Sequence, residues 1–220
     1  MSEEVLIPKM KRLESEDREL RIPWLNLALI VSCILLIVAS TFVNLNIKHY
    51  ILPGNLFSGK SLDYEDFVYS MYFIPQIPVI MFIVSFLGKK MSSVSIMFYI
   101  LLGLFFVPIF ALGGGVKYIF EYGFGYILAY IPAVIIAGNI LGDNYSFKNM
   151  IKATILGVLL IHIVGILYMI LIALIKGAGL DFITGWIASQ SGLKIIYDIV
   201  ASFVLVLIGK YLHAGLKFVL

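Results

Sequence analysis

Apolar residues in this chain gather into six long runs that are separated by short polar segments. The runs cover residues 24–46, 67–88, 92–112, 122–141, 150–175 and 194–212. A helix of about 20 apolar residues crosses the hydrocarbon core of a bilayer, and the runs lack the alternation of membrane strands. The pattern therefore predicts an all-α, polytopic membrane protein, with six transmembrane helices in residues 24–220 and a polar tail at 1–23.

Composition supports the same class of protein. Hydrophobic residues make up 61% of the 220 residues and charged residues 13%, whereas soluble domains carry about 25% charge. The net charge of +3 is too small to indicate a nucleic-acid partner, and membrane lipid is the expected surrounding. A single cysteine, Cys33, excludes an internal disulfide and a cysteine-based metal site.

Basic residues indicate how the chain lies across the membrane. If the N-terminus is cytoplasmic, eleven Lys and Arg residues fall inside and five fall outside, at Lys48, Lys60, Lys117, Lys176 and Lys194. Cytoplasmic segments carry the excess of positive charge. Five of the eleven inside residues belong to the N-terminal tail, so the predicted orientation depends on the tail. We therefore predict a cell-membrane protein whose N- and C-termini are both cytoplasmic.

Three of the predicted external segments are long or rich in glycine, namely 47–66, 113–115 and 177–192. The first is the longest, and a long loop among short-looped helices is often functional. In the third, Trp186 stands where an interfacial anchor is expected. These segments predict a ligand site that opens outward. The alternating charges of the N-terminal tail fit either a surface amphipathic helix or a solvated segment.

Sequence signatures of enzymes are missing from the chain. It has no His-Glu-x-x-His zinc motif, no Gly-x-Ser-x-Gly elbow and no P-loop. His49, His162 and His213 are predicted at three different depths, so we expect neither a metal cluster nor a cofactor. A multipass enzyme would need a polar catalytic pair at one depth, and none is evident. We therefore predict a protein that binds a small solute for transport.

Gln76 is the most informative polar residue, because the second run places it deep in the membrane between Pro75 and Pro78. Each proline removes an intrahelical hydrogen bond, which predicts that the carbonyls of Met71 and Ile74 lack their usual donors. A broken helix at this depth commonly lines a binding cavity. The alternative is a proline kink whose glutamine bonds a neighbouring helix.

Four further features each admit two interpretations. Asp198, near the outer end of the last run, could accept hydrogen bonds from a ligand or reach water. His162, central in the fifth run, could bind a neighbouring helix or a ligand. The backbone N–H groups of glycines 113–115, with Lys117 nearby, could hold an anion or form a flexible turn. The small residues Ala28 and Ser32, four apart, could pack against another subunit or another helix of this chain.

Several short motifs follow one another in a specific order. They are Gln76 twelve residues before Gly88, Tyr-Ile-Leu-Leu-Gly-Leu at 99–104, Val-Pro-Ile-Phe at 107–110, the glycines 113–115, and Gly-Tyr-Ile-Leu-Ala-Tyr at 125–130. In this order and spacing the chain resembles the BioY family, the biotin-specific substrate-binding (S) components of energy-coupling-factor (ECF) transporters. Glu-Tyr-Gly-Phe-Gly-Tyr at 121–126 and the set His162, Gly165 and Tyr168 make it most similar to cyanobacterial-type members.

The resemblance implies a six-helix S component with an outward biotin pocket, capped by the 47–66 segment. It implies that the protein is not an enzyme, and that it docks through Ala28 and Ser32 on a transmembrane coupling subunit driven by two separate ATPase subunits. The chain lacks the Gly-Pro-Thr-Gly-Gly-Tyr that many members have before the fourth helix, and the Pro-Gly that precedes the acid in their last helix. Two single positions also differ. Ala129 replaces a glycine, and Ala201 stands where many members have a lysine, three residues after the acid at Asp198.

For biotin as the ligand, we hypothesise a set of contacts. Asp198 and Gln76 would pair with the ureido group of biotin, and Tyr126 would pack on its ring. The amides of Gly113, Gly114 and Gly115, together with Lys117, would receive the carboxylate, and His162 belongs to the same predicted site. The alternative ligand is another vitamin or small solute, and the less favoured alternative is a multipass membrane enzyme.

Overall fold

The structure is a computed structural model that describes residues 23–52, 63–142 and 144–219. Its helices follow the apolar runs. They are listed in chain order here: α2 (Pro23–Phe42), α3 (Gln76–Phe105), α4 (Phe124–Leu141), α5 (Phe147–Ile175), α6 (Leu180–Ser191) and α7 (Lys194–Val219). Five segments of the described chain are long and apolar enough to cross a membrane. The expected all-α membrane fold is thus confirmed, whereas the predictions for the tail at 1–22 lie outside the described residues.

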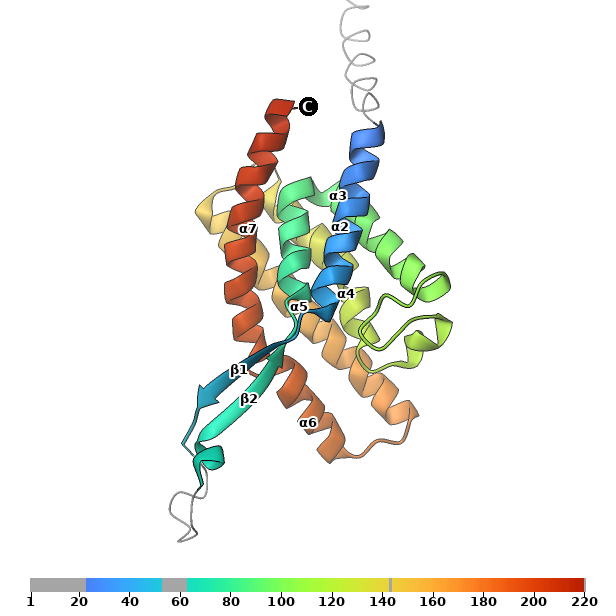
Figure 1. Ribbon diagram of the computed structural model, residues 1–220, viewed down its shortest axis with the longest axis vertical. Helices are drawn as coiled ribbons and strands as arrows, with labels where there is room; N and C mark the ends of the chain where they lie inside the picture. The colour runs from blue at the N-terminus through green and yellow to red at the C-terminus, as the bar shows by residue number, and fades with distance from the viewer. Residues whose placement is uncertain (1–22, 53–62, 143, 220) are drawn as a thin grey trace, which may run out of the picture.

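A sharp break at Gly88 divides α3 into two parts. Gly88 has a φ of 74° and a ψ of 176°, a left-handed backbone conformation that favours glycine, and the chain reverses its direction there (Figure 1). The Ser92 hydroxyl donates to the Gly88 carbonyl at 2.6 Å and so helps the second part to begin. The predicted second and third helices therefore correspond to the two parts of α3, which count together as one of the five candidate spans.

An antiparallel pair of strands is found where helix had been predicted, at the end of the first apolar run and at the start of the second. β1 (Leu45–Tyr50) pairs with β2 (Val68–Phe73), which follows a short 3₁₀ turn, η2 (Tyr64–Phe67). The predicted helices at 24–46 and 67–88 were therefore too long, because Val, Tyr and Phe in these stretches also favour strands. The strands contact α7, where the Tyr197 hydroxyl lies 2.6 Å from His49 Nε2.

The predicted proline kink around Gln76 is wrong. Pro75 is the N-cap of α3, Gln76 is its first residue, and Pro78 lies in its first turn. The N–H groups of a first turn have no intrahelical acceptor in any case, so a proline there breaks nothing. Met71, whose carbonyl was expected to be exposed by the kink, lies in β2 opposite Ile47.

Two other predicted boundaries also differ from the structure. The run at 92–112 ends as helix at Phe105, because the following segment folds back and Gly115 N–H donates to the Gly103 carbonyl at 2.8 Å. The segment 177–192 was expected to be a loop, but most of it forms α6. Asp181 in the first turn of α6 complements the helix dipole and so favours this helix. The glycines at both ends of the segment had led to the prediction of a loop.

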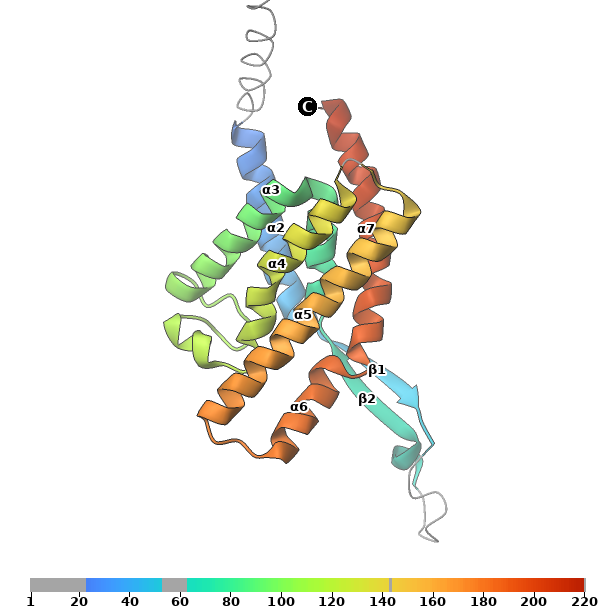
Figure 2. The same cartoon turned by 180° about the vertical axis from the view of Figure 1, so that it is seen from behind.

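The two ends of the bundle carry different elements (Figures 1 and 2). The start of α2, the Gly88 break, the turn between α4 and α5, and the end of α7 lie at one end. The strand pair, the segment 106–123 and α6 lie at the other, here called the strand-pair end. Lys89 Nζ donates to Asn139 Oδ1 at 2.8 Å, which joins the Gly88 break to the end of α4.

Helices α4 and α5 pack closely through two glycines that face tyrosines. A Cβ atom at Gly165 would lie 2.6 Å from the ring of Tyr126, and one at Gly125 would lie 2.2 Å from the Cβ of Tyr168. Real Cβ atoms do not approach other atoms so closely, so neither position has room for a side chain. This contact sets the position of Tyr126, which faces the site described next.

Candidate functional site

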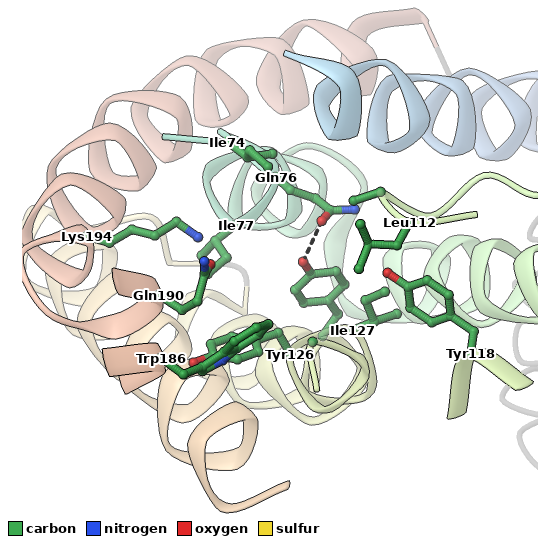
Figure 3. A pocket seen from close by; sticks show the side chains of 13 residues that line it. Ile74, Gln76, Ile77, Leu112, Tyr118, Tyr126, Ile127, Trp186, Gln190 and Lys194 are labelled. Carbon is green, nitrogen blue, oxygen red and sulfur yellow. Dashed lines mark hydrogen bonds between the residues drawn. The ribbon is translucent and has the colours of Figure 1, made fainter. Parts of the chain in front are cut away.

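A cavity of about 380 Å³ opens at the strand-pair end of the bundle. Figure 3 shows that its walls come from α3, α4, α6, α7 and the segment that precedes α4. Most of the lining is apolar or aromatic. The lining residues are Ile74, Gln76, Ile77, Ala111, Leu112, Tyr118, Gly123, Tyr126, Ile127, Tyr130, Trp186, Gln190 and Lys194. Sites for small molecules are typically apolar cavities of this size class, with a few placed polar groups.

Gln76 is held in the cavity wall by three hydrogen bonds. Its side-chain nitrogen donates to Thr41 Oγ1 and to the Tyr99 hydroxyl, both at 2.9 Å. Its carbonyl oxygen accepts from the Tyr130 hydroxyl, also at 2.9 Å (Figure 3). Both N–H donors of the amide are therefore used within the protein, and Oε1 retains capacity for one more bond. The amide connects α2, both parts of α3, and α4, so it bonds neighbouring helices and lines the cavity at once.

A second polar chain lies behind the Tyr126 side of the cavity. The hydroxyls of Tyr126 and Ser191 are 2.7 Å apart, and Ser191 Oγ lies 2.8 Å from His162 Nδ1. His162 Nε2 lies 3.1 Å from Asp198 Oδ2. A carboxylate only accepts hydrogen bonds, so Nε2–H donates to Asp198. The chain links α4, α6, α5 and α7, and its last two members are almost fully buried.

An aromatic group holds α6 beside the start of α4. The rings of Tyr122 and Trp186 have centroids 5.4 Å apart, and Phe182 lies 4.8 Å from Tyr122. Lys176 Nζ lies 4.5 Å from the centre of the Tyr122 ring, a favourable cation–π distance. Trp186 also lines the cavity, and its indole N–H has no hydrogen-bond partner among the described residues. The N–H itself is buried and not exposed to the cavity, so Trp186 contributes mainly an aromatic surface to the cavity wall.

The wall formed by the segment before α4 is also aromatic. Tyr118 belongs to the 3₁₀ turn η3 (Val116–Phe120), and its ring centroid lies 4.7 Å from that of Phe110. Burial raises the pKa of the Tyr118 phenol, so the group stays neutral in the physiological range. Tyr118 thus offers an uncharged hydroxyl to the cavity.

The structure brings only part of the predicted site to the cavity. Gln76 and Tyr126 line it. His162 and Asp198 lie behind the wall, with exposed fractions of 1% and 0%, and connect to the cavity through Ser191 and Tyr126. The ligand contacts predicted for these four residues stay predictions.

The predicted carboxylate site is not part of the cavity wall. The N–H of Gly113 donates to the Phe110 carbonyl at 3.0 Å and that of Gly115 to the Gly103 carbonyl at 2.8 Å. Gly114 lies against the backbone of residues 103 and 108, and Lys117 is exposed. This conformation therefore gives no support to an anion site at these amides. Ala28 and Ser32 are exposed on α2, and their contact with a coupling subunit stays a prediction.

Several cavity residues were missed from the sequence, namely Tyr118, Tyr130, Trp186, Gln190 and Lys194. Lys194 had been considered only as an external charge, although it stands four residues before Asp198, on the same face of one helix. Trp186 and Gln190 also lie four apart, which would have indicated a common helix face had α6 been recognised. Among the described residues, no three His, Cys, Asp or Glu side chains are placed to hold a metal ion.

Comparisons with known proteins agree with this arrangement. A crystal structure of the S-component for biotin from an ECF-type ABC transporter superposes with a TM-score of 0.61 and 19% identity, over 86% of this chain and 90% of that one. A probable biotin transporter BioY from Lysinibacillus sphaericus is 31% identical over 85 residues, which are 38% of this chain and 43% of that relative. The sequence profile of the BioY family matches residues 12–218, and the chain therefore belongs to the BioY family.

Proposed function

We propose that this protein captures biotin from the outer side of the cell membrane and serves as the S component of an ECF transporter. The observation that carries the proposal is the cavity at the strand-pair end, in a chain of the BioY family. Such a protein binds its ligand and does not transform it. The ATP hydrolysis that drives release would belong to separate ATPase subunits, joined to this chain by a transmembrane coupling subunit.

The chemistry of biotin fits the groups that line the cavity. Its fused rings are largely apolar and would pack on Tyr126 and Trp186. Its ureido group has two N–H donors, which would meet the free acceptor capacity of Gln76 Oε1 and of the Tyr130 hydroxyl oxygen. A cavity that already holds these side chains in place loses little conformational entropy on binding.

The arrangement of the ends supports the orientation inferred from the basic residues. Lys89 and Lys90 lie at the Gly88 break, at the same end as the start of α2 and the end of α7 (Figure 2). In the proposed orientation that end is cytoplasmic, and the strand pair, α6 and the cavity mouth face outward. The 47–66 segment, of which residues 53–62 lie outside the described residues, would cap the mouth.

A second candidate is an S component for another vitamin. The observation that favours it is the pair of alanines, Ala129 and Ala201, at positions where the family carries glycine and lysine. Ala129 is fully buried, so it changes the packing behind the cavity. A cavity altered in this way could prefer a related ligand, and a panel of vitamins separates the two candidates.

The chain provides its own reporter for the test. It has two tryptophans, of which Trp186 lines the cavity and Trp24 is 79% exposed at the opposite end. In the purified Trp24→Phe variant, we expect biotin to cause a saturable change in fluorescence, with radiolabelled biotin bound at about one per chain. Saturable binding of another vitamin without binding of biotin would establish the second candidate. Mass spectrometry of ligand retained through purification gives an independent answer.

A further inference from the structure

Lys194 places a positive charge in the cavity wall. It is the first residue of α7, and its side chain runs from that helix toward the cavity beside Gln190 (Figure 3). The side chain is half-buried. The only salt bridge among the described residues joins His162 and Asp198, so no described carboxylate lies within ion-pair distance of Lys194. The cavity therefore contains a cation without a described counterion.

The position of Lys194 is not explained by the stability of α7. A cation in the first turn of a helix opposes the helix dipole and so destabilises the helix slightly. Asp198 is one turn further along, but it is fully buried and its Oδ2 accepts from His162. The neighbouring Lys176 lies over the ring of Tyr122, which gives that lysine a partner that Lys194 does not have.

Gln190 and Trp186 line the same side of the cavity as Lys194 (Figure 3). The amide of Gln190 can donate two hydrogen bonds, whereas the indole N–H of Trp186 is buried and not exposed to the cavity. A cation with a neutral amide donor beside it is suited to a carboxylate, because charge-assisted hydrogen bonds are the stronger ones. Tyr118 and Leu112, on the opposite side of the cavity, bring no charge.

We propose that Lys194 binds the carboxylate of the ligand and thereby selects acids over their uncharged derivatives, with Gln190 as a neighbouring donor. This inference rests on the proposed capture of biotin. It gives the ligand a direction, with the carboxylate toward α6 and α7 and the ureido group toward Gln76 and Tyr130. It also assigns to Lys194 the part that the sequence had suggested for Lys117.

The test compares biotin with biotin methyl ester, which keeps the rings and lacks the negative charge. In the wild-type protein, biotin should bind at least tenfold more tightly than the ester. In Lys194→Ala, the affinity for biotin should fall at least tenfold, whereas the affinity for the ester stays within twofold. Lys194→Arg should keep most of the preference for the acid. Lys152→Ala, which removes an exposed lysine of α5, is the matched control and should bind both ligands like the wild type.

The outcomes separate this inference from the function on which it rests. If the wild type binds biotin and Lys194→Ala binds it equally well, the inference is wrong and the function stands. An equal loss of biotin and ester binding in Lys194→Ala also overturns it, because that result indicates damage to the cavity rather than loss of a charge contact. If the wild type binds no biotin, the proposed function fails and the inference fails with it.

Discussion

Tyr130 and Gln76 are joined across the cavity wall by a hydrogen bond of 2.9 Å, which the tyrosine hydroxyl donates to the glutamine Oε1. Tyr130 comes from α4 and Gln76 from the start of α3, so the bond fixes the two helices relative to each other. Since the Gln76 amide also donates to Thr41 and Tyr99, one side chain fixes the positions of three hydroxyl groups.

Gln76→Leu should therefore weaken ligand binding more than the loss of one contact. The substitution keeps the approximate side-chain volume but removes three hydrogen bonds. Thr41 keeps its bond to the Ile37 carbonyl, whereas Tyr130 loses the acceptor of its hydroxyl, and a buried unsatisfied group costs about 1–3 kcal/mol. We expect the dissociation constant for biotin to rise at least tenfold and the melting temperature to fall, measured by titration and thermal unfolding. Tyr130→Phe removes a single bond and should have a smaller effect on both. Wild-type affinity in Gln76→Leu would exclude a role for this network.

The apolar pattern of the sequence predicts some helix boundaries well and others poorly. Helices α4 and α5 begin and end within three residues of the predicted positions, because polar or glycine-rich segments bound them on both sides. The run at 67–88 was less informative, because hydropathy does not distinguish an apolar strand from an apolar helix. Pro75, read as a kink within a helix, is in fact the point where the strand has ended and α3 begins.

The site could be predicted only in part, for a related reason. Gln76 and Tyr126 were identified because an amide in an apolar run and a family motif mark them. Lys194 and Trp186 carry no such signal, since charged and aromatic residues are common at the outer ends of membrane helices. Their contribution depends on how α6 folds against α7, which is a tertiary property. The Ser191 bridge between Tyr126 and His162 likewise cannot be read from spacing.

The buried side chains of His162 and Asp198 should stabilise the fold mainly through their contact with each other. Removing one partner of a buried hydrogen-bonded pair leaves the other unsatisfied, which typically costs about 1–3 kcal/mol. Asp198 is fully buried and its Oδ1 already has no partner among the described residues. We therefore expect His162→Leu and Asp198→Leu each to lower the free energy of unfolding strongly.

The double variant His162→Leu/Asp198→Leu provides the decisive measurement for this pair. If the two side chains stabilise each other, the double variant should be clearly more stable than the sum of the single effects implies. Unfolding in mixed detergent micelles, followed by far-UV circular dichroism, gives the three free energies. Additive effects would show that the 3.1 Å contact contributes no coupling.

A methyl group at position 165 should disturb the cavity without altering any polar group. The added Cβ would lie 2.6 Å from the Tyr126 ring, so the ring or α5 must shift, and such overpacking typically costs about 1–3 kcal/mol. We expect Gly165→Ala to bind biotin several-fold more weakly and to melt at a lower temperature. The matched control is Gly185→Ala in α6, where the added Cβ meets nothing within 4 Å and alanine favours the helix. Equal behaviour of the two variants would contradict the packing argument.

The outward orientation of the cavity can be tested with single cysteines, because the natural Cys33 is 3% exposed and can be replaced by alanine. Ser189, exposed on α6, marks the strand-pair end, whereas Lys90, exposed beside the Gly88 break, marks the opposite end. If the basic residues at the Gly88 end are cytoplasmic, a membrane-impermeant maleimide added to intact cells should label Ser189→Cys and leave Lys90→Cys unmodified until the membrane is opened. The reverse labelling would place the cavity mouth in the cytoplasm, where it could not capture a solute from outside, and the proposed direction of uptake would have to be abandoned.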